Sequence, residues 1–188
     1  KKAACVKPVA AILNSVNIPS LSAAELAIPF KQSNKANVIE IMPNQITTKK
    51  LVCEVPVEAG HFIANTQQDF MKLAVVERHH SLGNIGLGIV HGSGLKYGAV
   101  ATTIAHDSHN AIVIGANDAD MLVALEAVQA MRGGLVVVNE GKVIGRLQLS
   151  IAGLMTDLTA EDAAVQLHEV HEALHIVHPT LDYHFFLT

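Results

Sequence analysis

Residues 99–115 read AVATTIAHDSHNAIVIG. In this stretch two short apolar runs, at 99–104 and 111–115, flank a polar connection. Short apolar runs that are rich in β-branched residues and bounded by polar residues are typical of buried strands. We therefore expect two strands of one sheet, with the connecting polar side chains held at the edge of that sheet.

The pattern outside this stretch predicts more strands and two long helices. One helix is expected to begin at Asn117-Asp118 and to stop at Gly133-Gly134, and a second to be capped by Thr159 and to end near Val177. Further strands are expected at 38–42, 51–57, the start of 69–80, 85–90, 135–139 and 142–147. This order of elements predicts an α+β fold, a layered domain with a mixed β-sheet and two main helices.

The N-terminal part of the chain is less regular. Pro8, Pro19 and Pro29 interrupt any long element, and 20–28 has room for one or two helical turns. We expect residues 1–36 to be an irregular segment, either an interdomain connection or the place where a longer protein was cut. Residues 37–188 are expected to form the domain itself.

The composition limits the classes of partner. Half of the 188 residues are hydrophobic, only 16% are charged, and the net charge is −4. An apolar composition of this kind favours a surface covered by another domain or by a second copy of the chain. No basic cluster suggests nucleic acid, and no run approaches the ~20 apolar residues of a membrane span. Cys5 and Cys53 lie far apart, which argues against a disulfide framework and favours the cytoplasm.

Histidines are the main candidates for chemistry, because the chain has eleven of them. His106, Asp107 and His109 place two imidazoles and a carboxylate within four residues. Such groups suit a general base with its orienting acid, or a transition metal such as Zn, Mn or Fe. We take these three as candidate catalytic residues with an accessory role, and His79, His80, His106 and His109 as candidate metal ligands. The alternative is a buried polar turn whose side chains satisfy one another.

Two neighbouring patterns have plainer interpretations. Glu77 and Arg78 are expected to form a structural ion pair beside His79 and His80. Four more histidines follow helical spacing near the C-terminus, and we expect them to lie beside an apolar face rather than to bind metal. They are His168, His171, His175 and His178, and the apolar face is Leu167, Val170, Leu174 and Val177.

These stretches resemble a known family. ERHHSLGNIGLG at 77–88, KYGAVATTIAHDSHN at 96–110, IGANDADM at 114–121 and IAGLMTD at 151–157 are similar to stretches of the C-terminal domains of bacterial adenine deaminases. The resemblance runs in the same order over about residues 35–175. Several separate motifs in one order are far more specific than a single short match.

The resemblance implies a role in an amidohydrolase. The adenine deaminase family belongs to the amidohydrolase superfamily, and its members hydrolyse adenine to hypoxanthine and ammonia in purine salvage, with Mn or Fe held in a (β/α)₈ barrel. This chain has no His-x-His pair and is too short for a barrel of about 250 residues. We therefore expect it to be inactive alone and to support the reaction of a parent enzyme. Its expected partners are the barrel of the same protein, adenine as the parent's substrate, and further copies in a homo-oligomer.

Two other readings stay open. The chain could be a scaffold or oligomerisation domain with structural histidines, or an independent metal-binding module. Under the leading hypothesis the segments 79–80 and 106–110 meet in space, either at the mouth of the barrel or as an accessory metal site.

Overall fold

A single eight-stranded sheet organises the chain. The computed structural model describes residues 9–13 and 15–181. The strand order is β10-β9-β7-β8-β5-β6-β1-β2, and every neighbouring pair is antiparallel except β1 and β6. The sheet is therefore mixed, and the expected α+β class is confirmed. The strands of this sheet are β1 (Lys35–Glu40), β2 (Lys49–Glu54), β5 (Phe70–Val76), β6 (Ile85–His91), β7 (Ala99–Thr102), β8 (Ala111–Gly115), β9 (Gly134–Asn139) and β10 (Lys142–Gln148).

The remaining elements are a small hairpin and three helices. The hairpin pairs β3 (Val57–Glu58) with β4 (His61–Phe62) around a turn at residues 59–60. The two main helices are α2 (Asp118–Ala130) and α3 (Ala160–Val177), and the third is the single turn α1 (Ala10–Leu13). The sequence pattern did not indicate α1, because one turn is too short to show a hydrophobic period.

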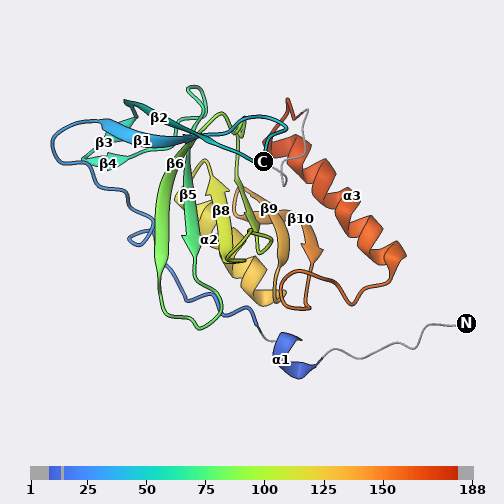
Figure 1. Cartoon of the computed structure of the whole chain (residues 1–188). Coiled ribbons are helices and arrows are strands. Elements are labelled where there is room, and N and C mark those ends of the chain that lie inside the picture. The colour runs from blue at the N-terminus through green and yellow to red at the C-terminus, as the bar shows by residue number, and fades with distance from the viewer. Residues whose placement is uncertain (1–8, 14, 182–188) are drawn as a thin grey trace, which may run out of the picture.

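The two main helices cover opposite faces of the sheet. Along β9 the side chains alternate, so that Val136 and Val138 pack with α2 in one apolar cluster while Leu135 and Val137 pack with α3 in another. Successive residues of a strand point to opposite faces. This half of the sheet is therefore the middle of three layers, with α2 behind the sheet and α3 at its other face (Figure 1).

Local capping signals begin both helices where the sequence predicts. The Asn117 side chain accepts a hydrogen bond from the Asp120 amide at the start of α2, and the Thr159 side chain accepts one from Asp162 at the start of α3. Both caps satisfy amide groups that have no partner within the helix. The predicted starts of both helices are confirmed.

One part of the predicted apolar face of α3 is wrong. Val170, Leu174 and Val177 are buried, but Leu167 is 40% exposed and Ala173 takes a buried place instead. The reason is that the helix contacts the sheet mainly through its C-terminal half, where Val170 and Ala173 approach Gly145 of β10. The N-terminal half of α3 extends past the sheet.

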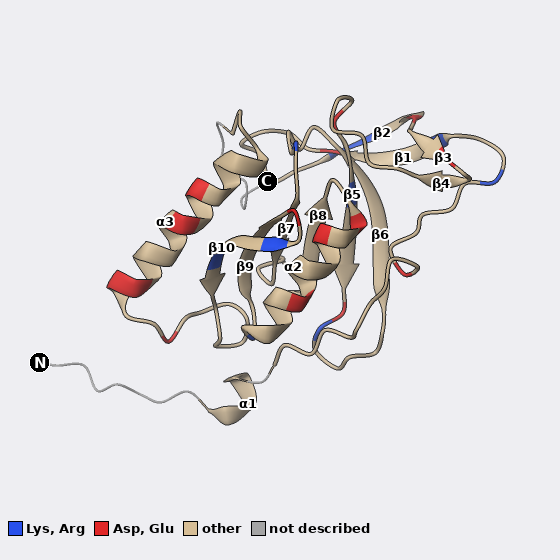
Figure 2. Cartoon of the chain, turned by 180° about the vertical axis from the view of Figure 1, so that it is seen from behind, with Lys and Arg blue, Asp and Glu red and all other residues tan. Residues whose placement is uncertain are grey.

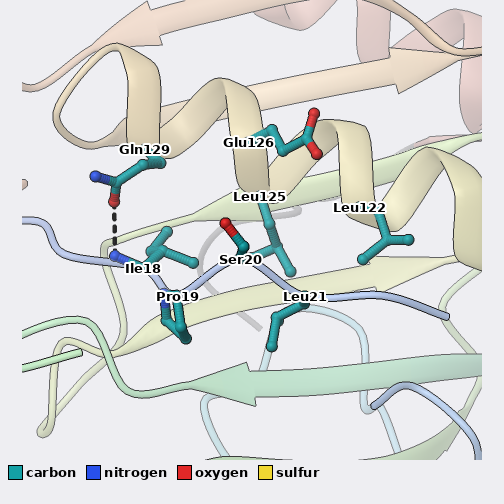
Figure 3. Close-up of a pocket in the computed structure, with 8 residues that line it drawn as sticks. All are labelled: Ile18, Pro19, Ser20, Leu21, Leu122, Leu125, Glu126 and Gln129. Carbon is teal, nitrogen blue, oxygen red and sulfur yellow. Dashed lines mark hydrogen bonds between the residues drawn. The ribbon is translucent and has the colours of Figure 1, made fainter. Parts of the chain in front are cut away.

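Residues 15–28, which we call the N-terminal strap, run across α2. Val16 and Leu26 are buried, and the Ile18 amide donates to Oε1 of Gln129 at 2.6 Å (Figure 3). The groove between the strap and α2 holds about 70 Å³, well below the 300–1,000 Å³ of small-molecule sites. It is an apolar packing seam. Where one or two helical turns were expected, at 20–28, the structure has a single turn at residues 23–26.

The two main helices carry acidic side chains and no strongly basic ones. Neither α2 nor α3 contains Lys or Arg, and both contain Asp and Glu (Figure 2). In α2 Glu126 is exposed, Asp118 is half-buried and Asp120 is buried. Among residues 9–13 and 15–181 no helix has the length and apolar character needed to cross a bilayer. Cys53 is a free thiol, and Cys5 lies outside the described residues.

Candidate functional site

The strand register brings the candidate segments to one end of the sheet. Val76 at the end of β5 pairs with Ile85 and Ala111, Thr102 at the end of β7 pairs with Ile112 and Leu135, and Gln148 pairs with Gly134. The loops 77–84, 103–110 and 149–157 therefore leave the sheet at the same end. We call this the histidine end; in Figure 1 it is the lower end of the sheet, where α1 also lies.

Two of these loops are in direct contact. Nε2 of His79 lies 3.0 Å from the carbonyl oxygen of Ser108 and donates to it in the tautomer that carries the proton there. The rings of His106 and His109 meet edge to face with their centroids 5.1 Å apart. The structure thus places His79 beside the turn that carries His106 and His109, and His80 follows in the same loop.

The turn at 106–109 is exposed at its first three residues and partly buried at its last. His106, Asp107 and Ser108 are exposed, while His109 is partly buried. The His106–Asp107 peptide bond is cis, and His109 has a left-handed φ of +50°. Nδ1 of His109 is buried without a hydrogen-bond partner among the described residues. That nitrogen is therefore available for a contact from outside the described residues.

The expected Glu77–Arg78 ion pair is wrong. The Glu77 carboxylate instead accepts hydrogen bonds from the backbone amides of His79, His80 and Leu82 at 2.6–2.9 Å. The Leu82 amide, and then the amides of His80 and His79, hold the pKa of this carboxyl below its usual value. Glu77 therefore closes the β5–β6 loop on itself, and its charge is satisfied within that loop.

Arg78 points the other way, into the protein. It is 1% exposed, and its guanidinium donates to three backbone carbonyls from three separate segments. Nε donates to His109 at 2.5 Å, Nη1 to Ser15 at 3.1 Å and Nη2 to Ala152 at 3.0 Å. Burial lowers the pKa of Arg78, but a guanidinium keeps its charge in proteins. No residue pattern indicates this network, because its acceptors are all backbone atoms.

The N-terminal strap begins at this end of the molecule. The Asn17 amide donates to the Arg78 carbonyl at 2.6 Å, and its side-chain amide donates to the carbonyl of His79 at 3.2 Å. Further back, the Ile12 carbonyl accepts from the Ala152 amide at 2.7 Å. The chain that leads into this domain is therefore tied to the loops that carry the histidines.

Within the described part of the chain, no three His, Cys, Asp or Glu side chains converge as metal ligands. The set His79, His80, His106 and His109 therefore stays a prediction, and it would need ligands from outside these residues. His168, His171 and His175 are exposed on α3, whereas His178 is buried at its C-terminal end. His91 lies at the opposite end of the sheet, 3.9 Å from a carboxylate oxygen of Glu40.

The fold and this end together define an α+β domain that carries an exposed histidine turn and has no complete metal site among its described residues. The model of the family described as adenine deaminase C-terminal domain matches residues 45–188. The chain belongs to this family.

Full-length relatives agree with that assignment. An adenine deaminase of Lysinibacillus sphaericus is 52% identical over 94% of the chain, and an adenine deaminase 2 of Carboxydothermus hydrogenoformans is 46% identical over 95%. An adenine deaminase of Bacillus pumilus is 43% identical over 97%. The chain spans only 30–32% of the length of these three relatives.

Proposed function

We propose that this domain supports the hydrolytic deamination of adenine to hypoxanthine and ammonia by placing its histidine end against the catalytic domain of the same protein. The family is that of a C-terminal domain, and about 70% of each relative lies outside the match, which leaves room for a catalytic barrel before it. On this proposal the catalytic Mn or Fe belongs to the barrel, because the described residues here do not supply a full set of ligands.

The course of the N-terminal strap supports this docking surface. A domain that precedes residue 9 is joined to the histidine end, since Ile12, Ser15 and Asn17 are bound there. The same end exposes large apolar side chains: Ile12 is 38% exposed, Leu82 64% and Met155 59%. Apolar side chains exposed around a polar group are typical of a surface that another domain covers.

His106, Asp107 and His109 have the chemistry for an accessory role at that boundary. The deamination adds water to the purine and releases ammonia, so protons must move during the reaction. Imidazole rings commonly serve as general acids and bases in enzymes, and exclusion of water by a covering domain strengthens the hydrogen bonds that such rings make. The exposed histidine turn is the observation that carries this proposal.

Alanine substitution in the full-length enzyme tests it. We expect His106→Ala and His109→Ala to lower kcat/KM for adenine by about 10²-fold or more, within the 10²–10⁴-fold range of general acid–base groups. His168→Ala and His171→Ala are matched controls, because these histidines are exposed on α3 and belong to no loop of the histidine end.

Unchanged turnover and metal content in the His106 and His109 variants would exclude the accessory role. A change of oligomeric mass with unchanged turnover would favour the scaffold function instead. The 188-residue chain alone, supplied with Mn²⁺ or Fe²⁺, should form no hypoxanthine. Turnover by that chain would place the catalytic site in this domain.

A further inference from the structure

Arg78 stands where four segments of the chain meet, and the proposed function leaves it without a role. Its backbone carbonyl accepts from Asn17, while its side chain donates to Ser15, His109 and Ala152. We infer that Arg78 is a positioning residue, which fixes the turn bearing His109 to the N-terminal strap and so sets where the His109 ring faces the catalytic domain. This inference rests on the proposed function.

The site is built around a guanidinium group. Three different nitrogen atoms each reach a different segment, which only the fixed fork of Arg allows, since Lys presents its donors from one atom. Gly153 packs on the group so closely that an added Cβ would lie 3.0 Å from three of its atoms, and Gly153 has φ +69°. Among the described residues Arg78 forms no ion pair, so backbone carbonyls alone face its buried charge.

The contact of Arg78 with His109 links this network to the proposed accessory residues. Nε of Arg78 binds the carbonyl of a residue with left-handed backbone, and the amide of that residue donates to Ala105. Backbone conformations of this kind persist where the surroundings fix them. Because both peptide groups of His109 are held, the direction in which its side chain leaves the backbone is fixed, and its ring meets His106 edge to face. Removal of the Nε donor of Arg78 frees the carbonyl of His109.

The contact with Ser15 joins the same group to the incoming chain. The strap is bound at Ser15 by the side chain of Arg78 and at Asn17 by its backbone. A shift of the preceding domain is therefore passed to His109 directly through Arg78, and less directly through the contacts of Asn17 with His79 and of His79 with Ser108. A displacement of about 1 Å at a reacting group can lower a rate by ~10²-fold, so this link is enough to matter for turnover.

The test combines Arg78→Lys, which keeps the charge, with His109→Ala in the full-length enzyme. We expect Arg78→Lys to lower kcat roughly 10- to 100-fold with little change in KM, and the double variant to be no slower than His109→Ala. Lys72→Met is the matched control: Lys72 is a buried cation, 5% exposed, on the strand β5 that leads into the loop of Arg78, but it pairs with Asp118 at the opposite end of the sheet. That control should keep its kcat.

Ring signals of the histidines separate this inference from the proposed function. In the ¹³C-labelled 188-residue chain, Arg78→Lys should shift the ring resonances of His106 and His109, and Lys72→Met should not. Unmoved ring signals, or rate losses that multiply in the double variant, overturn the positioning role. Moved signals together with full turnover of His109→Ala support the positioning and overturn the accessory function.

Discussion

At the scale of single residues, the charge of Glu77 closes the loop that carries His79 and His80. Its carboxylate accepts three backbone amides, and the first cause of its lowered pKa is the amide of Leu82. A carboxyl group whose pKa is lower in the folded state adds stability above its unfolded value. That contribution is complete above pH 4.5, the ordinary value, and is lost as the pH falls through the lower folded value.

We therefore expect the amides of Leu82 and His80 to exchange faster with solvent in Glu77→Gln at neutral pH, because the neutral amide is a weaker acceptor. Below the folded pKa of Glu77, the wild type and the variant should become alike. Hydrogen exchange followed across this range measures the effect. Glu25→Gln is the control: hydrogen bonds from Ser22 lower the pKa of Glu25 in the same way, but in the strap turn. Equal protection of the loop in wild type and Glu77→Gln at neutral pH would contradict this account.

The residue scale is also where the sequence is least informative. Glu77 and Arg78 are adjacent and of opposite charge, which suggests an ion pair. In an extended chain, however, successive side chains point to opposite sides, so Glu77 turns to its own loop while Arg78 turns inward. Glu77 accepts from backbone amides of its own loop, and Arg78 donates to backbone carbonyls of distant segments. Every residue has these backbone groups, so the identity of the residues does not indicate which of them will be a partner. The histidine turn could be found because its chemistry lies in its side chains.

At the scale of elements, the close approach of α3 to β10 depends on Gly145. An added Cβ would lie 2.6 Å from Cβ of Ala173 and 2.9 Å from the Glu169 carbonyl oxygen. The register of β10 shifts at this glycine, as is usual for a bulge in a strand. The helix therefore rests on the backbone of the strand, and any side chain at 145 must push α3 away from the sheet.

We expect Gly145→Ala to lower the free energy of unfolding by about 1–3 kcal/mol, the usual range for overpacking. Denaturant unfolding of the chain, followed by far-UV circular dichroism, measures it. Gly86→Ala is the matched control, because Gly86 also lies within a strand and an added Cβ there meets nothing within 4 Å. A Gly145→Ala chain as stable as the control would mean that α3 moves freely over β10.

Elements were predicted well where their causes are local. The capping side chains of Asn117 and Thr159 act on amides three residues away, so the starts of α2 and α3 could be read directly. The strand order could not, because pairing β1 with β6 and β7 with β9 depends on contacts between distant residues. The placement of Leu167 failed for the same reason: only the sheet decides how much of α3 it covers.

At the scale of the whole molecule, the N-terminal strap is a part of the core and, on the function proposed above, also the connection to a preceding catalytic domain. Leu26 is fully buried in the cluster formed with α2, and Val16 is 5% exposed. The family match begins at residue 45 and the expected domain boundary lies near residue 36. We propose that the folding unit begins earlier, near residue 15.

Removal of the strap tests this proposal. A chain that begins at residue 29 keeps all eight strands but loses Leu26 and Val16, together with the partly buried Ile18 and Leu21. Full burial of one such side chain stabilises a fold by about 1.5–3 kcal/mol, and whole domains are stable by only about 5–15 kcal/mol. We expect this chain to unfold at a much lower urea concentration, and Leu26→Ala in the full chain to lose about 2–5 kcal/mol. A chain that begins at residue 9 retains the strap and serves as the control. If the chain from residue 29 were as stable as that control, the strap would add nothing to the stability of the fold. The hydrogen bond between Arg78 and the strap would then serve only to place the catalytic domain proposed above.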